Sequence, residues 1–454
     1  MTASRILTFV TLGLALARVG GGTSASDSWT EPRPIARDVP AFRAPEEPPD
    51  PGVEEPSVAE PEGSIALRDA LALALMHNPE LAVFSWETRA GEAAALQAGK
   101  MANPELDFRV YDLGITRPNV PEDETRYRAM LSQEFELGGK RGKRSDLALA
   151  ERDVAGWDYE TKRIEVATGV TSRFVAVLGG QQRVETLARN VEFFEQTRDR
   201  VSALVETGAM RRVEVHQVTR QVGLARIDRQ RAEAELSIAR FRLAAMWGSR
   251  SPRFSEALGE LGSPAPLPDI ETVIELARHS PAVSQWDAEY ARGEAALALA
   301  KAGRVPDLTV GAGYRWADER DGEDFLVDVE IPLPFLDRKQ GDRRRARFDM
   351  ARARAGRQAA AATSAEGIAE FYYQVMESGA RSRTLREEVV PAARANLEAH
   401  RLGLERNADN LGDLLDAQRD LARAEVELTD ALVDYHQAHS WLEGIVGQRI
   451  GAAE

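Results

Sequence analysis

The stretch HNPELAVFSWETRAGEAAALQAGKMANPEL, residues 77–106, recurs about 200 residues later as HSPAVSQWDAEYARGEAALALAKAGRVPDL, residues 279–308. The two copies share a His-x-Pro start, a Gly-Glu-Ala-Ala centre and a Pro-acid-Leu end at one constant offset. Further along, the offset slips slightly and then holds again, so that Gly208 pairs with Asn407, Glu214 with Asp413 and Gly248 with Gly447. A period this long indicates a duplicated half of one body rather than a solenoid repeat.

The composition excludes several classes of protein. The 454-residue chain has no cysteine, which excludes disulfides, thiolate metal sites, cysteine nucleophiles and acylation at an N-terminal cysteine. Its 58 basic and 73 acidic residues give a net charge of -15, which disfavours nucleic-acid binding. No Ser-His-acid constellation stands out, so we expect neither an enzyme nor a cofactor. His436 and His439 lack a third ligand, so we expect no metal site.

The N-terminal region is typical of an exported protein. Residues 1–25 predict a signal peptide, because Arg5 precedes an apolar run that is followed by small residues. Residues 26–63 are rich in prolines and acids and predict a disordered or extended tether. No later stretch offers the roughly 18 consecutive apolar residues of a transmembrane helix.

The rest of the chain divides into a first repeat at residues 64–250, a linker at 251–268, a second repeat at 269–448 and a tail at 449–454. Each repeat opens with a helical pattern that is broken at an x-Pro pair. Two runs with alternating apolar and polar residues follow in each repeat and predict half-buried strands: 106–110 and 131–137, then 308–314 and 325–331.

A very long helical pattern follows each strand pair. The first runs from about Lys143 to Glu206, roughly 95 Å at the rise of an α-helix. Its counterpart runs from about Asp342 to Arg406, and Pro391 predicts a kink or a restart. Helices of this length predict coiled-coil struts.

The helices that return after each long helix carry heptad columns. The second repeat pairs a large column with a column of alanines: Leu414, Leu421, Leu428, Tyr435 and Leu442 beside Ala417, Ala424, Ala431 and Ala438. The first repeat has an equivalent pair: Val215, Val222, Leu236 and Leu243 beside Val218, Ala225, Ala232 and Ala239. Arg229 interrupts the large column of the first repeat, and the sequence does not explain it. A strict seven-residue repeat predicts left-handed supercoiling.

These elements predict a mainly α fold with a small β part. Four strands cannot close a barrel, and small transmembrane barrels have at least about eight strands. Cyclic assembly of three copies would give a twelve-stranded β-barrel without open edges, continued by a coiled-coil tube of α-helices.

The duplicated plan, from Leu67 to about Gly447, resembles the outer-membrane efflux protein (TolC-like) family. The stretch EFELGGKR, residues 134–141, followed by Arg144, is similar to the strand-to-helix junction of the cobalt-zinc-cadmium (CzcC-like) branch. The resemblance implies a homotrimeric exit channel, with an outer-membrane barrel and a periplasmic tunnel, that exports heavy-metal cations. Its partners would be a periplasmic adaptor (membrane fusion) protein, an inner-membrane transporter of the RND type and outer-membrane lipid, with no nucleic acid.

The turns between the long helices and their returning partners carry the implied site. In the family such turns meet the adaptor, which assigns that contact here to Gly208, Ala209, Met210, Asn407, Ala408 and Asp409. Residues 413–417, DLLDA, resemble the entrance motif, so that Asp413 and Asp416, with Glu214, would form the pore constriction. The structural alternative is that Glu214 and Asp413 are N-caps.

One departure from the family concerns the lock of the closed entrance. Family members often use a basic residue and a tyrosine, whereas this sequence has Asp409 and Leu404 at those positions. Arg211 or Arg212 are candidates for the basic member.

Basic clusters at the start of both long helices oppose the helix dipole and predict an anionic partner such as lipid phosphate. A solvated basic collar is the alternative. The clusters comprise Lys140, Arg141, Lys143 and Arg144, then Arg338, Lys339, Arg343, Arg344 and Arg345.

Three other functions remain open on sequence grounds. The channel could export organic drugs or secreted proteins, because cargo is chosen by the pump. The chain could instead be a soluble periplasmic coiled-coil scaffold, although its alternating strands favour a barrel. A metal-binding periplasmic chaperone is disfavoured, because the chain has no Cys and only 6 His.

Overall fold

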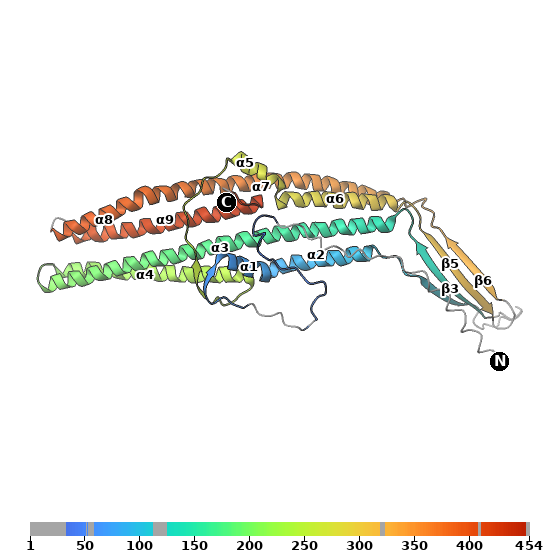
Figure 1. Cartoon of the computed structure of the whole chain (residues 1–454), viewed down its shortest axis with the longest axis horizontal. Helices are drawn as coiled ribbons and strands as arrows, with labels where there is room; N and C mark the ends of the chain where they lie inside the picture. The colour runs from blue at the N-terminus through green and yellow to red at the C-terminus, as the bar shows by residue number, and fades with distance from the viewer. Residues whose placement is uncertain are drawn as a thin grey trace.

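The computed structural model describes residues 33–50, 52, 59–111, 125–317, 323–406 and 410–450. The chain forms a long rod of helices with a small β-sheet at one end and two helical hairpin ends at the other (Figure 1). Across the described ranges, no helix is long and apolar enough to cross a membrane. The predicted signal peptide and the last residues of the predicted tail, 451–454, lie outside these ranges.

The duplication organises the fold. The first repeat contains α1 (Leu67–His77), α2 (Pro79–Ala98), β2 (Glu105–Tyr111), β3 (Arg126–Phe135), α3 (Lys140–Glu206) and α4 (Arg212–Ala244). The second contains α5 (Ile270–Leu276), η4 (Ala277–His279), α6 (Pro281–Ala302), β5 (Leu308–Ala317), β6 (Asp324–Glu330), α7 (Gln340–Thr384), α8 (Val390–Glu405) and α9 (Leu411–Val446). Because α3 packs along α6 and α9 as well as along α2 and α4, the two repeats lie side by side.

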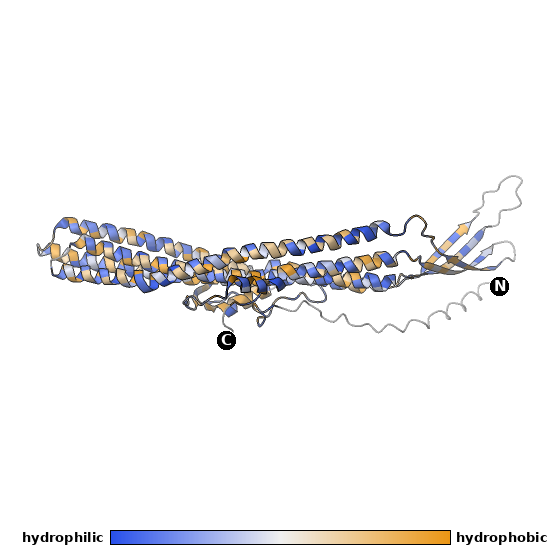
Figure 2. Ribbon diagram, turned by 90° about the horizontal axis from the view of Figure 1, so that it is seen from above, coloured by the Kyte–Doolittle hydropathy of each residue, from blue (hydrophilic) through white to orange (hydrophobic). Residues whose placement is uncertain are grey.

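The strands of both repeats form one antiparallel sheet in the order β2-β3-β5-β6. One row of paired residues crosses it on the apolar face: Leu106, Leu131, Ala312 and Val327. The adjacent row lies on the polar face: Glu105, Ser132, Gly311 and Asp328. The predicted alternation is confirmed, and Figure 2 shows it as alternating colours along the strands. The apolar face is uncovered, since Val327 is 79% exposed.

The heptad columns pack as the sequence predicts. On α9, every member of both columns is buried except Leu428, which is half-buried. On α4, the buried members of the two columns are Val218, Val222, Ala225, Ala232, Leu236 and Leu243. Arg229 is half-buried, and its guanidinium Nε lies 3.2 Å from a carboxylate oxygen of Glu233 on the same helix.

The two long helices differ near Pro391. The first, α3, is unbroken over 67 residues. In the second repeat α7 ends at Thr384, and a π-helical turn, η5 (Leu385–Val389), separates it from α8. Proline has no N–H, and its ring clashes with the carbonyl of the preceding turn in a regular α-helix. The wider π turn accommodates this ring, so the predicted perturbation at Pro391 is confirmed.

A smaller body lies beside the middle of the rod. It contains a parallel pair of short strands, β1 (Gly63–Ala66) and β4 (Phe254–Leu258), and the short helix η3 (Ala245–Trp247). These elements and α1 surround the fully buried Trp247. β4 lies within residues 251–268, which were predicted to be a linker, and the strand pair was not predicted, because runs of this length are too short for a periodic signal.

A disordered or extended tether was predicted for residues 26–63, and residues 33–50 are instead docked on the helices. Ala36, Val39 and Ala44 are buried, and the Phe42 N–H donates to the carbonyl of Leu75 on α1 at 2.9 Å. The prediction of disorder is wrong here, because small side chains and backbone hydrogen bonds hold this segment without a long apolar run.

Candidate functional site

The two hairpin ends lie together at the end of the rod farthest from the sheet (Figure 1). A cluster of buried apolar side chains joins α3 and α4 to the start of α9; its members are Val191, Phe194, Val201, Val218, Val222, Ala225, Leu411, Leu414 and Leu415. Met210 of the first turn and Leu404 of α8 pack against the same cluster. The described parts of the two hairpin ends therefore form one packed unit rather than two separate tips.

The first turn is held by its own backbone and by one ion pair. Gly208 adopts the left-handed conformation with φ of 77°, as predicted for a helix end. The N–H groups of Ala209 and Met210 donate to the carbonyl of Leu204 at 2.8 and 3.2 Å. Glu214 accepts from the Arg211 N–H at 3.3 Å and from its guanidinium at 3.0 Å.

The second turn is capped by an amide. The Asn410 side-chain oxygen accepts from the Asp413 N–H at 3.1 Å, and its amide nitrogen donates to the Asp413 carboxylate at 2.6 Å. Residues Asn407, Ala408 and Asp409, the predicted adaptor contacts of this turn, lie outside the described residues.

The N-cap alternative for Glu214 and Asp413 is wrong in its positions. Arg211 and Asn410 are the N-cap residues, and the two acids stand at the third helical position, where they complete the cap. Asn410 stands three residues before Asp413, which is the spacing of an N-cap and its third helical residue. The alignment of the two repeats pairs Glu214 with Asp413 and does not point to Asn410.

Asp413 and Asp416 lie on one exposed face of α9, as their spacing predicts. The opposite face buries Leu414 and Leu415 in the bundle. Asp416 pairs with Arg419 of the same helix. Glu214 differs from the two aspartates, because its side chain is only 16% exposed and its carboxylate is held by Arg211.

The predicted lock residues occupy different surroundings. Arg211 is engaged by Glu214 within its own turn, and Leu404 packs in the apolar cluster of the hairpin ends. Asp409 lies outside the described residues.

Polar links between α3 and α9, which the sequence analysis missed, join the two hairpins. The buried Gln418 amide donates to the Asn190 side-chain oxygen at 3.1 Å. Glu425 lies 3.4 Å from Arg189 on α3 and 3.0 Å from Arg394 on α8, which ties three helices together. The sequence places the polar residue Gln418 next to the apolar columns of α9, and a buried polar group needs a hydrogen-bond partner. The sequence does not show which residue that partner is.

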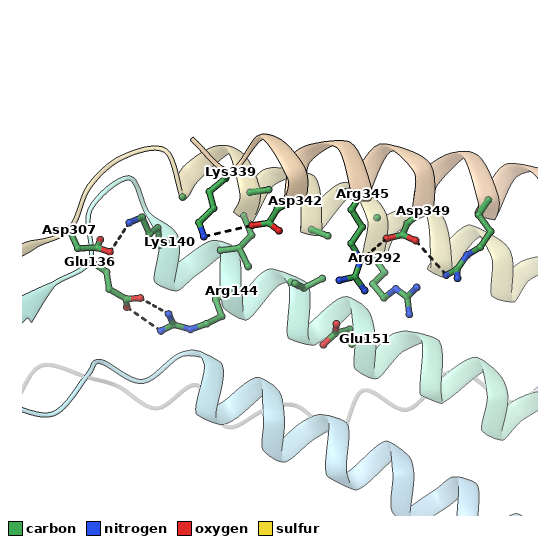
Figure 3. Close-up of a pocket in the computed structure, with 18 residues that line it drawn as sticks. Glu136, Lys140, Arg144, Glu151, Arg292, Asp307, Lys339, Asp342, Arg345 and Asp349 are labelled. Carbon is green, nitrogen blue, oxygen red and sulfur yellow. Dashed lines mark hydrogen bonds and ion pairs between the residues drawn. The ribbon is translucent and has the colours of Figure 1, made fainter. Parts of the chain in front are cut away.

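Four residues of the basic clusters line a cavity of about 850 Å³ between α3, α6 and α7: Lys140, Arg144, Lys339 and Arg345 (Figure 3). Most of its cations are paired. Lys140 Nζ lies 2.7 Å from Asp307, Arg144 donates to Glu136 at 3.1 Å, and Lys339 Nζ lies 3.8 Å from Asp342. The collar is therefore a mixed network and not a block of free positive charge. Arg344 instead stacks over the Phe348 ring, with its guanidinium carbon 5.5 Å from the ring centroid.

The two histidines of α9 have structural partners. His436 Nε2 lies 3.1 Å from the carbonyl of Gly262, and burial lowers the pKa of its imidazole. His439 Nδ1 lies 3.9 Å from Glu443. In the part of the chain that the structure describes, no three His, Cys, Asp or Glu residues form a group that could hold a metal ion.

Comparison with known proteins covers both repeats. Residues 70–249 and 273–448 match the sequence model of a family described as outer membrane efflux protein. The chain is 29% identical over 386 residues to the cobalt-zinc-cadmium resistance protein CzcC of Cupriavidus metallidurans. This alignment covers 85% of this chain and 91% of CzcC. It is 24% identical over 284 residues to the nickel-cobalt-cadmium resistance protein NccC of Alcaligenes xylosoxydans xylosoxydans, an alignment that spans 62% of each protein.

The fold is that of a solved transmembrane channel. The crystal structure of CusC, described for its folding and transmembrane channel formation, superposes with a TM-score of 0.69 at 14% identity. The superposition covers 90% of this chain and 99% of that chain.

Proposed function

The chain belongs to the outer membrane efflux protein family, and from this premise we propose that three copies form the exit channel of a tripartite efflux system. It is an outer-membrane protein. In the proposed assembly the sheet lies in the outer membrane and the helical rod extends into the periplasm. The channel performs no chemistry of its own.

The sheet carries the argument for assembly. Within the described residues, the outer edges of β2 and β6 have no strand partner, and one face of the sheet is apolar and uncovered. Unpaired strand edges and an exposed apolar face are costly in water. Pairing β6 of one copy with β2 of the next would close twelve strands into a barrel with its apolar face toward lipid.

The hairpin ends carry the argument for a periplasmic partner. They form one packed unit at the end of the rod opposite the sheet, so that the unit would face an adaptor and an inner-membrane transporter of the RND type. In the trimer, the exposed face with Asp413 and Asp416 would point to the threefold axis and constrict the entrance. Glu214, held by Arg211, would support the tip.

Heavy-metal cations are the proposed cargo. The relatives CzcC and NccC are named for resistance to cobalt, zinc, nickel and cadmium, and the first of them aligns with most of this chain. An acidic entrance attracts cations and disfavours anions. A duct for organic drugs or secreted proteins is the second candidate.

Outer-membrane lipid is the proposed partner of the strand-to-helix junction. Leu333, Phe335 and Leu336, between β6 and α7, are exposed, and the cationic residue Arg338 stands two residues after Leu336. Apolar side chains next to cations fit the boundary between acyl chains and phosphates.

Metal tolerance tests the proposed cargo. A strain of the source bacterium without this protein should grow less well in cobalt, zinc or cadmium salts and normally with dyes and detergents. Plasmid-borne wild-type protein should restore growth, whereas a version without residues 411–446 should not. Sensitivity to dyes alone would favour the drug duct, and recovery of the protein in the soluble periplasmic fraction would favour a scaffold.

A further inference from the structure

An ion pair lies buried in the middle of α3. Glu160 and Arg163 are one helical turn apart, and their side chains are 1% and 2% exposed. Arg163 donates from Nε and Nη2 to the two carboxylate oxygens, both at 2.8 Å. A buried ion pair alone contributes little to stability, because desolvation of both charges offsets their attraction. Its remaining hydrogen-bonding groups therefore need partners.

Those partners come from the N-terminal strap, defined as residues 33–44. Arg163 Nη1 donates to the carbonyls of Ile35 at 2.8 Å and Ala36 at 3.3 Å, and Nη2 donates to that of Arg33 at 3.2 Å. In return Glu160 accepts from the Arg33 N–H at 2.6 Å. A guanidinium has five N–H groups, so the carboxylate and the strap together satisfy all of them.

The far end of the strap is held by three more side chains. The Tyr159 hydroxyl donates to the carbonyl of Phe42 at 2.7 Å, and burial raises the pKa of this phenol to about 12, which keeps it a donor. On α2, the Ser85 hydroxyl oxygen accepts from the Ala44 N–H at 2.7 Å. The Arg89 Nε donates to the Ala44 carbonyl at 2.6 Å.

Apolar contacts support the same docking. Ala36 and Val39 belong to one buried cluster with Leu75 of α1 and with Trp247. Ala44 is fully buried, so a larger side chain has no space at this position. The strap therefore completes the core in the middle of the rod.

The second repeat has no equivalent of this arrangement. When the two long helices are aligned at their first residues, Lys140 and Gln340, the pair corresponds to Ala360 and Thr363. Among the described residues, an ion pair at this place is found only in the repeat that contacts the strap. We therefore connect the ion pair with the docking of the strap.

We propose that the surface of α1, α2 and α3 around Glu160 and Arg163 is a peptide-binding site whose ligand is the N-terminal strap. The site recognises an extended peptide through backbone carbonyls and small side chains. Because the strap contacts all three helices, its docking clamps α1 and α2 onto α3.

Cleavage after folding tests the site. A protease site inserted at Gly52, an exposed turn residue, allows the assembled full-length protein to be cut in detergent. The N-terminal fragment should remain bound to the purified protein. In Arg163→Met it should be released at least about tenfold faster, because three strap contacts and the partner of Glu160 are lost. The matched change in the second repeat, Thr363→Met, should leave release at the parental rate.

Two outcomes would overturn the proposal: immediate loss of the fragment from the cut parent, or equal release from the parent and Arg163→Met. Tyr159→Phe provides the same test if Arg163→Met does not fold. It removes one hydrogen bond while keeping the ring, and should speed release about fivefold. Release at the parental rate from Tyr159→Phe would likewise contradict a site that holds the strap by its carbonyls.

Discussion

The first repeat keeps α3 unbroken over 67 residues, whereas the second follows the equivalent path with α7, a π-helical turn and α8. The first repeat also binds the strap through Glu160 and Arg163, where the second has Ala360 and Thr363. At both ends of the rod the repeats instead match, with two strands each in the sheet and one pair of helices each, α3 with α4 and α8 with α9, at the hairpin ends.

This contrast indicates which parts of the structure must have the same form in both repeats. Strands of both repeats must share one sheet, and both hairpin ends pack in one apolar cluster. The middle of the rod has no such requirement. A single proline or a docked peptide has therefore made the repeats different there without changing the ends.

The largest expected effect concerns the sheet, where the repeats should behave alike. Leu131→Arg in the first repeat and Val327→Arg in the second lie in one row on the apolar face. Each should block assembly in the outer membrane, because a cation in the middle of the lipid face costs about 2–4 kcal/mol in every copy. Oligomer yield on mild gels measures the effect.

The opposite face supplies the controls for this pair. Ser132→Arg and Asp328→Arg lie in the adjacent row and should assemble. Equal loss of oligomer on both faces would mean that the assigned lipid face is wrong.

The second largest effect is expected when a proline is introduced into the long helix of the first repeat and removed from that of the second. Glu192 on α3 is exposed and corresponds to Pro391 when the hairpin turns are aligned. Glu192→Pro should destabilise the protein by about 3 kcal/mol, because the unbroken helix has no π turn to accommodate the ring. Pro391→Ala should change the stability by less than about 1 kcal/mol, since α8 already packs on α9 beyond the break.

Thermal unfolding followed by circular dichroism measures both changes, with Glu192→Ala as the control for loss of the side chain. Equal destabilisation by Glu192→Pro and Glu192→Ala would show that α3 tolerates a break, and the contrast between the two long helices would then have no energetic meaning.

A further comparison separates the two turns. Asp413→Asn with Asp416→Asn should reduce cation selectivity and block by divalent cations in planar bilayers, because rings of carboxylates attract cations. Glu214→Gln should have a much smaller effect on selectivity, since the Glu214 side chain is only 16% exposed whereas both aspartates are exposed. Yield of the oligomer should stay unchanged in both variants. A double aspartate variant that conducts and is blocked like the parent would remove these residues from the entrance.

The smallest expected effect concerns the residue directly before each long helix. Gly139 and Lys339 both adopt the left-handed conformation there, with φ of 72° and 56°. Gly139→Ala should destabilise the protein by about 1 kcal/mol, and Lys339→Gly should offset part of that by relieving a similar strain. Thermal midpoints of the two single variants and the double variant measure this, and a stabilising Gly139→Ala would contradict it.

The parts of the fold that could be predicted are those in which residue types repeat along the sequence at a regular spacing. The duplication, the strand alternation, the heptad columns and the break near Pro391 are all periodic or depend on one residue with a fixed backbone effect. The strap and the β1–β4 pair have no period, and contacts such as that between Arg163 and Ile35 join residues far apart in the chain. The site was only partly predictable, because the spacing of Asp413 and Asp416 gives their shared face but not the Arg211 contact that occupies Glu214.

The copy number and strand pairing of the intact particle test the central claim most directly. Electron microscopy of the detergent-extracted protein should show three copies around one open axis, with β6 of each copy paired to β2 of the next and the hairpin ends gathered at the far end. A single copy, or an assembly in which another element covers the apolar face of the sheet, would contradict the account.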